Sequence, residues 1–257
     1  MLNSCIIAAS NNRDILHTNL LASPDLVGKE TSIQQGAVSA GEAYNRGIDA
    51  TQAELMIFAH QDMFLPAGWL GKLQRVLEEL ERTDPHWGVL GMFGVTASGD
   101  GHGHLYSTGL QRELGENFEG AREVESLDEI VLVLRRPSGL RFDEGLPGFH
   151  LYGADICTLA RSRGLKNYAF ASFAVHNTNG IPLLPAAYWK CYLHLRAKWR
   201  QRLPVMTPCM PITRSPGPAL RYLAKRVPRT VLKRIKTGKR TTSQAELQAI
   251  VARYISG

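Results

Sequence analysis

A polar triplet, His60-Gln61-Asp62, directly follows a short apolar run at residues 55–59. The run is too short to cross a membrane and is typical of a strand buried on both faces, as in parallel sheets. The carboxyl end of such a strand is where open α/β sheets bind ligands. The Asp62 carboxylate is therefore a candidate ligand-binding group, and a helix-capping or turn aspartate fits the same local spacing.

A second acid with a defined setting is Asp155. Apolar positions 156, 159 and 160 share a helix face, and Gly164 favours the end of that helix. Asp155 then lies in the first helical turn, where the helix dipole favours an ionised carboxylate. The residue can serve simply to complement that dipole. In a functional role it would be a general base facing the sheet edge.

The histidines give weaker signals. His176 follows a predicted strand at 170–175, and spacing alone favours a structural role for it. His102 and His104 lie in the glycine-rich stretch 99–104, which predicts a mobile loop that covers a substrate. Because no third ligand is close in sequence, a metal site at these two histidines is disfavoured.

Strands and helices that could position these groups are spread along the chain. Residues 5–9 predict a first buried strand, which ends in a polar turn at residues 10–14 that can hydrogen-bond a ligand. Ser39 and Glu42 form a capping-box pattern at the start of a helix that carries Asn45, and the amino end of that helix could bind phosphate or be an ordinary capped end. Further strands are predicted near 31–34, 89–95 and 130–134, and a helix at 69–82.

Composition limits the class of protein. The 257 residues suit one large α/β domain with an appendage. The four cysteines are far apart, which argues against a disulfide framework or a zinc knuckle and fits a reducing compartment: Cys5, Cys157, Cys191 and Cys209. No secretory signal and no apolar run long enough for a membrane helix is apparent.

Charge is distributed unevenly. Residues 177–257 contain 16 Lys and Arg and one acid, Glu246, so their net charge is +15. Residues 1–176 contain 14 basic and 22 acidic residues, so their net charge is −8. The two parts sum to the net charge of +7. Five prolines predict a semi-rigid linker at 204–218, followed by a basic amphipathic helical tail at 219–257. Such a tail can lie on an anionic membrane surface or pack on the domain as a solvated helix.

Two of these motifs, in this order, resemble the family 2 glycosyltransferases of GT-A fold. Residues 39–62 are similar to that family's small-residue helix with Asn-x-Gly and the following strand that ends in Asp-x-Asp. Residues 153–164 are similar to its Gly-Glu-Asp helix with a downstream Arg and Gly. The resemblance covers about residues 3–180. It is closest to a bacterial subgroup that carries His-Gln-Asp in place of Asp-x-Asp.

The resemblance implies a role for each candidate residue. Asp62 would bind Mn²⁺ or Mg²⁺ and the diphosphate of the donor, His176 would be a further metal ligand, and Asp155 would be the catalytic base of an inverting transfer. The donor site would also include Ala8, Ser10, Asn45, His60 and Gln61. Nearby Trp69 and Tyr152 could stack on a sugar or belong to the core. The sequence departs from the family pattern at His60, at Tyr44 where Arg is frequent, and at Ala154 where Glu is usual.

The implied architecture is a GT-A, Rossmann-like, mixed and mostly parallel sheet flanked by helices, formed by residues 1–203 and followed by the linker and the basic tail. The implied protein is a cytoplasmic enzyme, peripheral at the inner face of the membrane if the tail binds lipid. It would transfer a sugar from a UDP-linked nucleotide-sugar to a glycan or lipid-linked acceptor. Two alternatives remain: a sugar-phosphate nucleotidyltransferase, although residues 10–13 make a poor phosphate loop, and a non-enzymatic polyanion binder. Nucleic acid is a disfavoured partner because aromatic residues are not interleaved with the basic ones.

Overall fold

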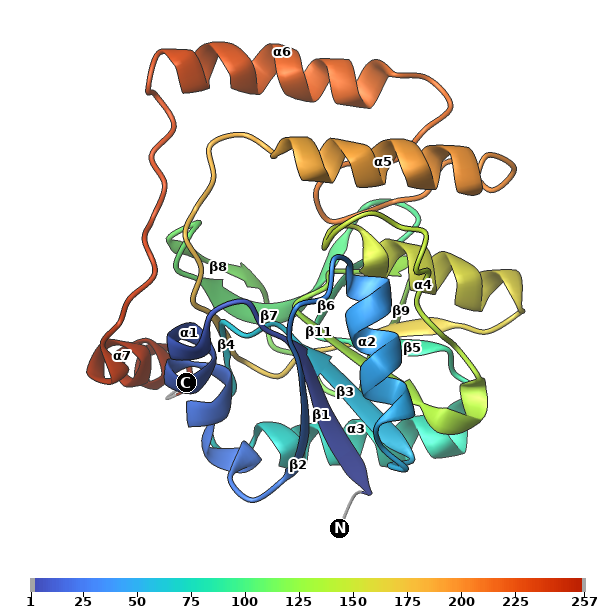
Figure 1. Ribbon diagram of the computed structural model, residues 1–257, viewed down its shortest axis with the longest axis vertical. Coiled ribbons are helices and arrows are strands. Elements are labelled where there is room, and N and C mark those ends of the chain that lie inside the picture. The colour runs from blue at the N-terminus through green and yellow to red at the C-terminus, as the bar shows by residue number, and fades with distance from the viewer. Residues whose placement is uncertain (1–2, 256–257) are drawn as a thin grey trace.

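A seven-stranded mixed sheet forms the centre of the structure, a computed structural model that describes residues 3–255 (Figure 1). Its strand order is β2-β1-β3-β11-β5-β12-β9. β1 pairs in parallel with β2 and with β3, whereas β11 runs antiparallel between β3 and β5. The strands are β1 (Ser4–Ala9), β2 (Glu30–Gln34), β3 (Leu55–Ala59), β5 (Val89–Gly91), β9 (Ala121–Val124), β11 (Val131–Arg135) and β12 (Asn167–Phe170).

A second, smaller sheet continues beyond the carboxyl ends of these strands. Its order is β10-β6-β7-β13-β4, and β8 pairs with β7. β13 is antiparallel to β4, which places His176 opposite Met63. The strands are β4 (Met63–Phe64), β6 (Phe93–Val95), β7 (Gly101–Ser107), β8 (Arg112–Gly115), β10 (Ser126–Leu127) and β13 (Val175–His176).

Helices cover both faces of the central sheet. Successive side chains of a strand point to opposite faces, so Ile7 and Phe58 pack on one side, and Ile6 and Ile57 on the other. The first side is covered by α2 (Ala40–Asp49) and α4 (Tyr152–Ser162), and the second by α1 (Arg13–Thr18) and α3 (Trp69–Thr83). Because both faces are buried, β1 and β3 have nearly continuous apolar sequences. Short 3₁₀ turns occur at η1 (Leu20–Ala22), η2 (Pro24–Leu26) and η3 (Arg136–Ser138).

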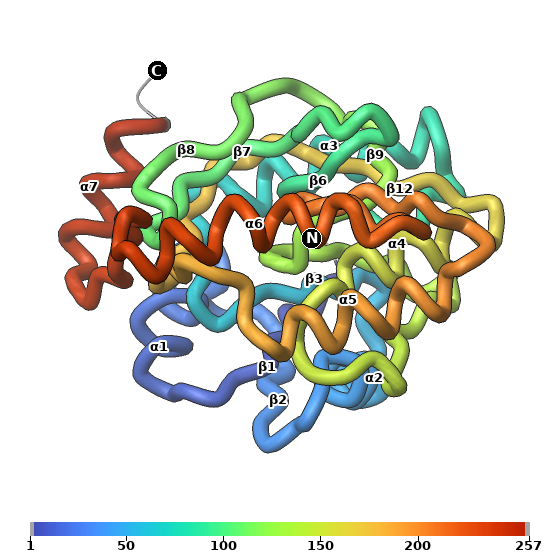
Figure 2. Tube along the Cα trace, turned by 90° about the horizontal axis from the view of Figure 1, so that it is seen from above, coloured from blue at the N-terminus to red at the C-terminus, as the bar shows by residue number. Residues whose placement is uncertain are grey.

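The C-terminal part of the chain contributes three more helices: α5 (Ala186–Lys198), α6 (Gly217–Val231) and α7 (Gln244–Ile255). α5 and α6 lie side by side on the side of the sheet where β1 and β3 end (Figures 1 and 2). The rings of Trp189 and Tyr222, 5.9 Å apart between centroids, join these two helices. α7 lies away from them, where Leu247 is buried with Phe64 of β4.

The proline-rich stretch 204–218 is attached to the domain. Val205 and Ile212 form a β-bridge, and both side chains belong to the core on the α2 and α4 side. The domain limits predicted at residues 203 and 218 stay a prediction. The β-bridge and the core contacts of Val205 and Ile212 show that this stretch packs against the domain. No helix within residues 3–255 has the length and apolarity needed to cross a bilayer.

Several predicted elements are confirmed. The strands at 5–9, 31–34 and 55–59 and the helix at 69–82 correspond to β1, β2, β3 and α3. The amide of Glu42 donates to Ser39 Oγ at 3.2 Å, as the capping box requires. The mixed sheet is also confirmed, and three of its six neighbouring strand pairs are parallel.

Three predicted elements differ. Residues 89–95 form two strands in different sheets, β5 and β6. In β6, a Cβ at Gly94 would lie 2.7 Å from the Ser126 carbonyl, so glycine lets β10 approach. Residues 170–175 likewise separate into the end of β12 and the start of β13. The loop predicted at 99–104 is mostly strand β7, paired with β6 and β8, so its glycines serve close packing and not mobility.

Candidate metal and donor site

Three residues from two distant segments of the sequence meet beyond the carboxyl end of β3. His60 and Asp62 lie on the turn between β3 and β4, and His176 ends β13, the partner strand of β4. The amide of Asn177 donates to the Asp62 carbonyl at 2.9 Å and continues this pairing. One candidate ligand atom from each of the three side chains lies within 4.8 Å of the other two, and no other group of this kind occurs among residues 3–255.

The charges at this cluster favour an ionised Asp62. Burial opposes ionisation, but His176, His60 and Arg240 outweigh it and hold the pKa of Asp62 well below its usual value. Burial would lower the pKa of His176, yet Asp62, with an oxygen 3.5 Å from His176 Nε2, raises it. The pKa of His60 is lowered, chiefly by burial. The cluster therefore offers one carboxylate and two imidazoles, a donor set that suits a divalent transition metal.

Tyr152 holds the ring of His60. Its hydroxyl oxygen lies 2.8 Å from His60 Nε2, donates to the Glu129 carbonyl at 3.1 Å, and lies 3.2 Å from the hydroxyl of Tyr44. Because the Tyr152 proton goes to Glu129, the Tyr152 oxygen accepts from His60 Nε2. The neutral imidazole then keeps a lone pair on Nδ1, as a metal ligand must. Tyr152 is 2 % exposed, so it is a core residue and does not present its ring to a sugar.

Gln61 links the turn at 60–62 to the end of β1. Its Oε1 accepts from Ser10 Oγ at 2.9 Å and from the amides of Asn11 and Asn12, both at 3.2 Å, and its Nε2 donates to Asn11 Oδ1 at 2.7 Å. The predicted donor-site residues Ser10 and Gln61 therefore lie together, beside His60 and Asp62. This arrangement places two polar strand ends at the same edge of the sheet.

Three other sequence candidates lie elsewhere. Ala8 is fully buried in β1 and contributes no polar side-chain atom to the cluster. Asn45 uses both ends of its amide within the protein: Oδ1 accepts from the Phe142 amide at 3.0 Å, and Nδ2 donates to the Phe142 carbonyl and to Glu144. Trp69 is 1 % exposed and packs 5.7 Å from the Phe170 ring, so it is a core residue.

Asp155 lies in the first turn of α4, as predicted. Its side chain is 2 % exposed and contacts the end of α5, where Lys198 Nζ lies 2.8 Å and Trp199 Nε1 2.7 Å from its oxygens. Burial raises the pKa of Asp155, and Lys198 and Trp199 act in the opposite direction. A Cβ at Gly153 would lie 2.6 Å from the Leu127 carbonyl, so glycine permits close packing there. The sharp entry into α4 comes from Leu151, which has φ = 63°.

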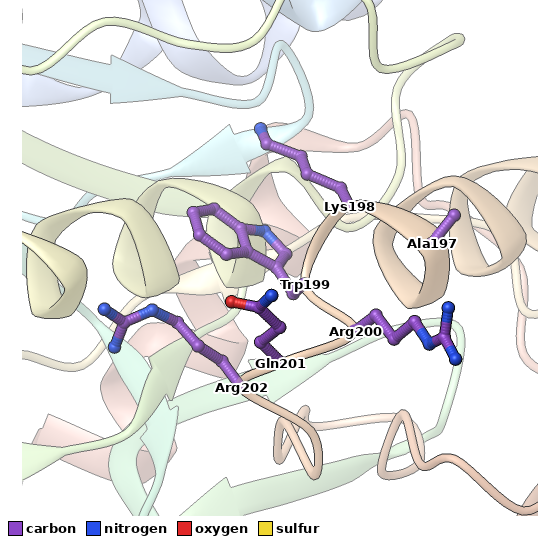
Figure 3. A pocket seen from close by; sticks show the side chains of 6 residues that line it. All are labelled: Ala197, Lys198, Trp199, Arg200, Gln201 and Arg202. Atoms are coloured by element: carbon purple, nitrogen blue, oxygen red, sulfur yellow. The ribbon is translucent and has the colours of Figure 1, made fainter.

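A pocket adjoins this acid. It has a volume of about 460 Å³ and is lined by residues 197–202 at the end of α5. Figure 3 shows Lys198 and Trp199 extending to the same side and Arg200 to the other. The groups that hold Asp155 therefore also line a hollow where a second molecule can approach.

The acids considered as rivals to Asp155 are engaged in other contacts. Asp143 is 3.1 Å from His194 Nε2 and 2.8 Å from Lys198 Nζ, and these contacts, together with the Gly145 amide, overcome burial and bring its pKa to about 2. Glu144 accepts from Asn45. A third acid, Glu129, is not evident from the sequence: burial and then Asp128 raise its pKa to about 8. The only feature of the local sequence that could have indicated Glu129 is the Asp128-Glu129 pair before strand β11.

The two histidines of the glycine-rich stretch contact different partners. His104 Nε2 lies 2.6 Å from Glu113 Oε1 on the neighbouring strand β8, and His102 Nδ1 lies 3.2 Å from the Arg122 guanidinium. Each imidazole thus contacts a charged side chain from another segment, and the absence of a metal at His102 and His104 stays a prediction.

No protein-family model matches the chain. A curated relative, "ATP synthase subunits region ORF 6" from Fuscovulum blasticum, is 33 % identical over 129 residues. That match includes 48 % of this chain and half of the relative's length, and its name gives no activity.

Among solved structures, GalNAc-T7 in complex with UDP, GalNAc and Mn²⁺ superposes with a TM-score of 0.53 at 10 % identity, over 77 % of this chain and 48 % of that one. The fold is similar to the GT-A glycosyltransferase fold. A mannosyltransferase from Pyrobaculum calidifontis, in complex with GDP-Man and Mn²⁺, matches with a TM-score of 0.44 at 11 % identity, over 78 % of this chain and 64 % of that one. This chain thus spans about half the length of the curated relative and of GalNAc-T7.

Proposed function

We propose that this protein is a glycosyltransferase that binds a nucleotide-sugar and a divalent cation at His60, Asp62 and His176. The observation that carries the proposal is the convergence of these three side chains at the carboxyl end of β3 in a GT-A-like fold. The resemblance of residues 39–62 and 153–164 to family 2 supports the same activity from the sequence. The solved GT-A relative with a TM-score above 0.5 contains UDP and Mn²⁺.

The donor set fits Mn²⁺ better than Mg²⁺. Mg²⁺ prefers oxygen ligands, whereas imidazole suits the transition metals. His60, Asp62 and His176 would hold the cation together with oxygens of the diphosphate. When bound, the cation would neutralise the charge that develops on the diphosphate as the glycosidic bond breaks. Tyr152 would keep His60 oriented, and the bonds from Gln61 to Ser10 would hold the neighbouring strand end in place.

Asp155 is the proposed base of an inverting transfer. It would accept the proton of the acceptor hydroxyl while that oxygen attacks the sugar from the face opposite the diphosphate. Its buried position, which raises its pKa, makes it a stronger base than an exposed aspartate. Because Lys198 and Trp199 now cover its oxygens, an acceptor would reach Asp155 only if the end of α5 moves. The pocket at 197–202 supports entry from that side.

A glycan or lipid-linked acceptor is proposed from the C-terminal charge. α6 carries Arg221, Lys225, Arg226 and Arg229, while Leu220 and Val231 are 59 % and 74 % exposed. A helix with exposed apolar and basic residues can bind an anionic lipid surface. This would place the protein at the inner face of a membrane, close to such an acceptor. The alternative of a nucleic-acid binder is weaker, because Tyr222 packs toward Trp189 of α5.

Calorimetry with nucleoside diphosphates tests the donor site. UDP and GDP are titrated into the protein with Mn²⁺, with Mg²⁺ and with EDTA. We expect at least one of the two to bind more tightly with Mn²⁺. Asp62→Asn and His176→Ala should remove this metal dependence, whereas Glu81→Gln, which removes an exposed carboxylate of α3, should retain it. Equal binding with Mn²⁺ and EDTA in the wild type contradicts the proposal.

A further inference from the structure

Arg240 contacts the candidate metal site from the far end of the chain. Its Nη2 lies 2.8 Å from Asp62 Oδ2, while the other oxygen of Asp62 faces His176. Arg240 Nε donates to the Asn177 carbonyl at 2.7 Å, directly after His176. The side chain is 20 % exposed. One guanidinium therefore binds next to both strand ends that supply the metal ligands.

The segment that carries Arg240 is fixed to the same strand end. Asn177, which is fully buried, accepts from the Thr241 amide at 2.9 Å and donates to the Thr241 carbonyl at 2.8 Å. Asn179 Oδ1 accepts from the Arg240 amide at 2.9 Å. We call residues 236–243 the strap, because they pass from α6 to α7 along one side of the molecule (Figure 1).

Glycines let the strap lie directly on the domain. The Gly238 amide donates to the Gly109 carbonyl at 2.9 Å, and the Gly180 amide donates to the Gly238 carbonyl at 3.0 Å. A Cβ at Gly238 would lie 1.9 Å from the Thr108 carbonyl, which no side chain permits. Beyond the strap, α7 is held by Leu247 in the core. The strap is therefore tied at both ends, and the position of Arg240 is defined by backbone contacts.

The position of Arg240 beside the candidate metal site suits the binding of an anion. Arginine is the side chain that best matches phosphate, through a planar fork of donors that always carries a charge. Asp62 and a divalent cation together carry one positive charge. Arg240 adds a second positive charge. The two positive charges together balance the two negative charges of a sugar-nucleotide diphosphate. When a cation takes the Asp62 carboxylate, the Arg240 fork is free to turn to the oxygens of the diphosphate bound to that cation.

We propose that Arg240 is a diphosphate-binding residue of the donor site, supplied by the strap, and that it exchanges Asp62 for the diphosphate when the metal and the nucleotide bind. This inference rests on the proposed function and adds to it a residue outside the region that resembles family 2. Asn177 and Asn179 are the positioning residues that hold the strap in reach.

Binding measurements on three variants test the role of Arg240. Arg240→Ala removes the guanidinium, and Arg240→Lys keeps the charge without the fork. Lys239→Ala, at the exposed neighbouring position, removes the same charge from the same strap and is the matched control. For each protein, Mn²⁺ alone is titrated with detection by electron paramagnetic resonance. UDP and GDP are then titrated by calorimetry with saturating Mn²⁺.

For Arg240→Ala we expect Mn²⁺ alone to bind at least as tightly as in the wild type, because a competing cation has left Asp62. The nucleoside diphosphate should bind about 10- to 100-fold more weakly, the range for a lost charge-assisted hydrogen bond. The affinity of Arg240→Lys for the nucleoside diphosphate should lie between those of Arg240→Ala and the wild type. The affinity of Lys239→Ala should match that of the wild type. Limited trypsin digestion should cleave after Lys239 more slowly when Mn²⁺ and the nucleotide are present, since Arg240 then holds the strap to the ligand.

Two results overturn the proposal in distinct ways. If the wild type binds Mn²⁺ and a nucleoside diphosphate, but Arg240→Ala binds that diphosphate as Lys239→Ala does, Arg240 has no role in the donor site and the proposed function stands. If Arg240→Ala loses Mn²⁺ binding, Arg240 acts by positioning Asp62 and not through the diphosphate. A wild type that binds neither metal nor nucleotide rejects the proposed function itself.

Discussion

Lys198 Nζ lies 2.8 Å from an oxygen of Asp155, and this ion pair joins the end of α5 to the first turn of α4. Lys198 is partly exposed, whereas Asp155 is almost completely buried. The proposed base is therefore shielded from solvent by a residue of a different helix. Any acceptor hydroxyl that Asp155 deprotonates must first replace Lys198 or Trp199.

Asp155→Asn should lower transfer by about 10²- to 10⁴-fold, the usual cost of removing a positioned general base. Binding of the nucleoside diphosphate with Mn²⁺ should stay near the wild-type value, since the change leaves the metal ligands in place. Initial rates of sugar transfer and calorimetry measure the two effects.

Asp143→Asn is the control for that change, because Asp143 also pairs with Lys198. It should alter turnover by less than Asp155→Asn. If Asp155→Asn keeps near-normal turnover while Glu129→Gln loses it, the base is Glu129, the half-buried acid near Tyr152.

Tyr152→Phe should weaken Mn²⁺ binding by about 10- to 100-fold, the usual effect of removing a partner that orients a metal-binding histidine. The change deletes the hydroxyl that lies 2.8 Å from His60 Nε2. Titration of Mn²⁺ followed by electron paramagnetic resonance measures the loss. Tyr192→Phe is the matched control, since the buried Tyr192 hydroxyl makes no hydrogen bond within the described part of the chain. Equal Mn²⁺ affinity in the two variants would mean that Tyr152 does not orient His60.

Glu129→Gln should change the pH dependence of stability. In the folded protein the pKa of Glu129 is raised to about 8, so between the ordinary carboxyl range and pH 8 the folded state retains a proton that the unfolded state has released. The contribution of Glu129 to stability is thus present at low pH and lost as pH rises toward 8. The melting temperature of Glu129→Gln should rise relative to the wild type from pH 5 to pH 8.

The surface variant Glu81→Gln provides the reference for this experiment, and its melting temperature should follow the wild type at every pH. Scanning calorimetry at half-unit intervals of pH gives the comparison. A constant difference between Glu129→Gln and the wild type across this range would show that Glu129 titrates as an ordinary carboxyl group.

Neutralising α6 should reduce binding to anionic membranes. Replacing its four basic residues, Arg221, Lys225, Arg226 and Arg229, by Gln should lower sedimentation with phosphatidylserine vesicles by more than about 10-fold, because each basic residue near such a surface contributes about 1 kcal/mol. Phosphatidylcholine vesicles should bind neither protein. Point changes are preferable to removal of the tail, because Arg240 and Leu247 contact the domain.

A second variant with the same net charge tests whether α6 itself is required. It replaces four exposed basic residues outside the tail by Gln: Arg13, Arg75, Arg82 and Arg112. This protein should sediment with phosphatidylserine vesicles much as the wild type does. An equal loss in both variants would mean that net charge, and not α6, governs the attraction.

Local sequence patterns determine much of the fold. The apolar run at 55–59 is typical of a strand or a short buried segment, and the polar triplet after it marks the sheet edge. Ser39 and Glu42 define the start of α2, since a cap is a contact between residues three apart. Asp62 and Asp155 are recognisable as candidates because each lies next to a local structural signal.

The tertiary structure decides which of these groups share a site. His176 meets Asp62 only because β13 pairs with β4, and nothing near His176 in sequence specifies that pairing. Arg240 is one of the many basic residues after position 177, and the bonds that Asn177 and Asn179 accept from residues 240 and 241 place it at the site. Strand pairing and buried hydrogen bonds between distant segments depend on the whole packed chain, whereas periodicity and capping depend on neighbours within a few residues. For that reason the sequence indicates the candidate acids, and the fold selects their partners.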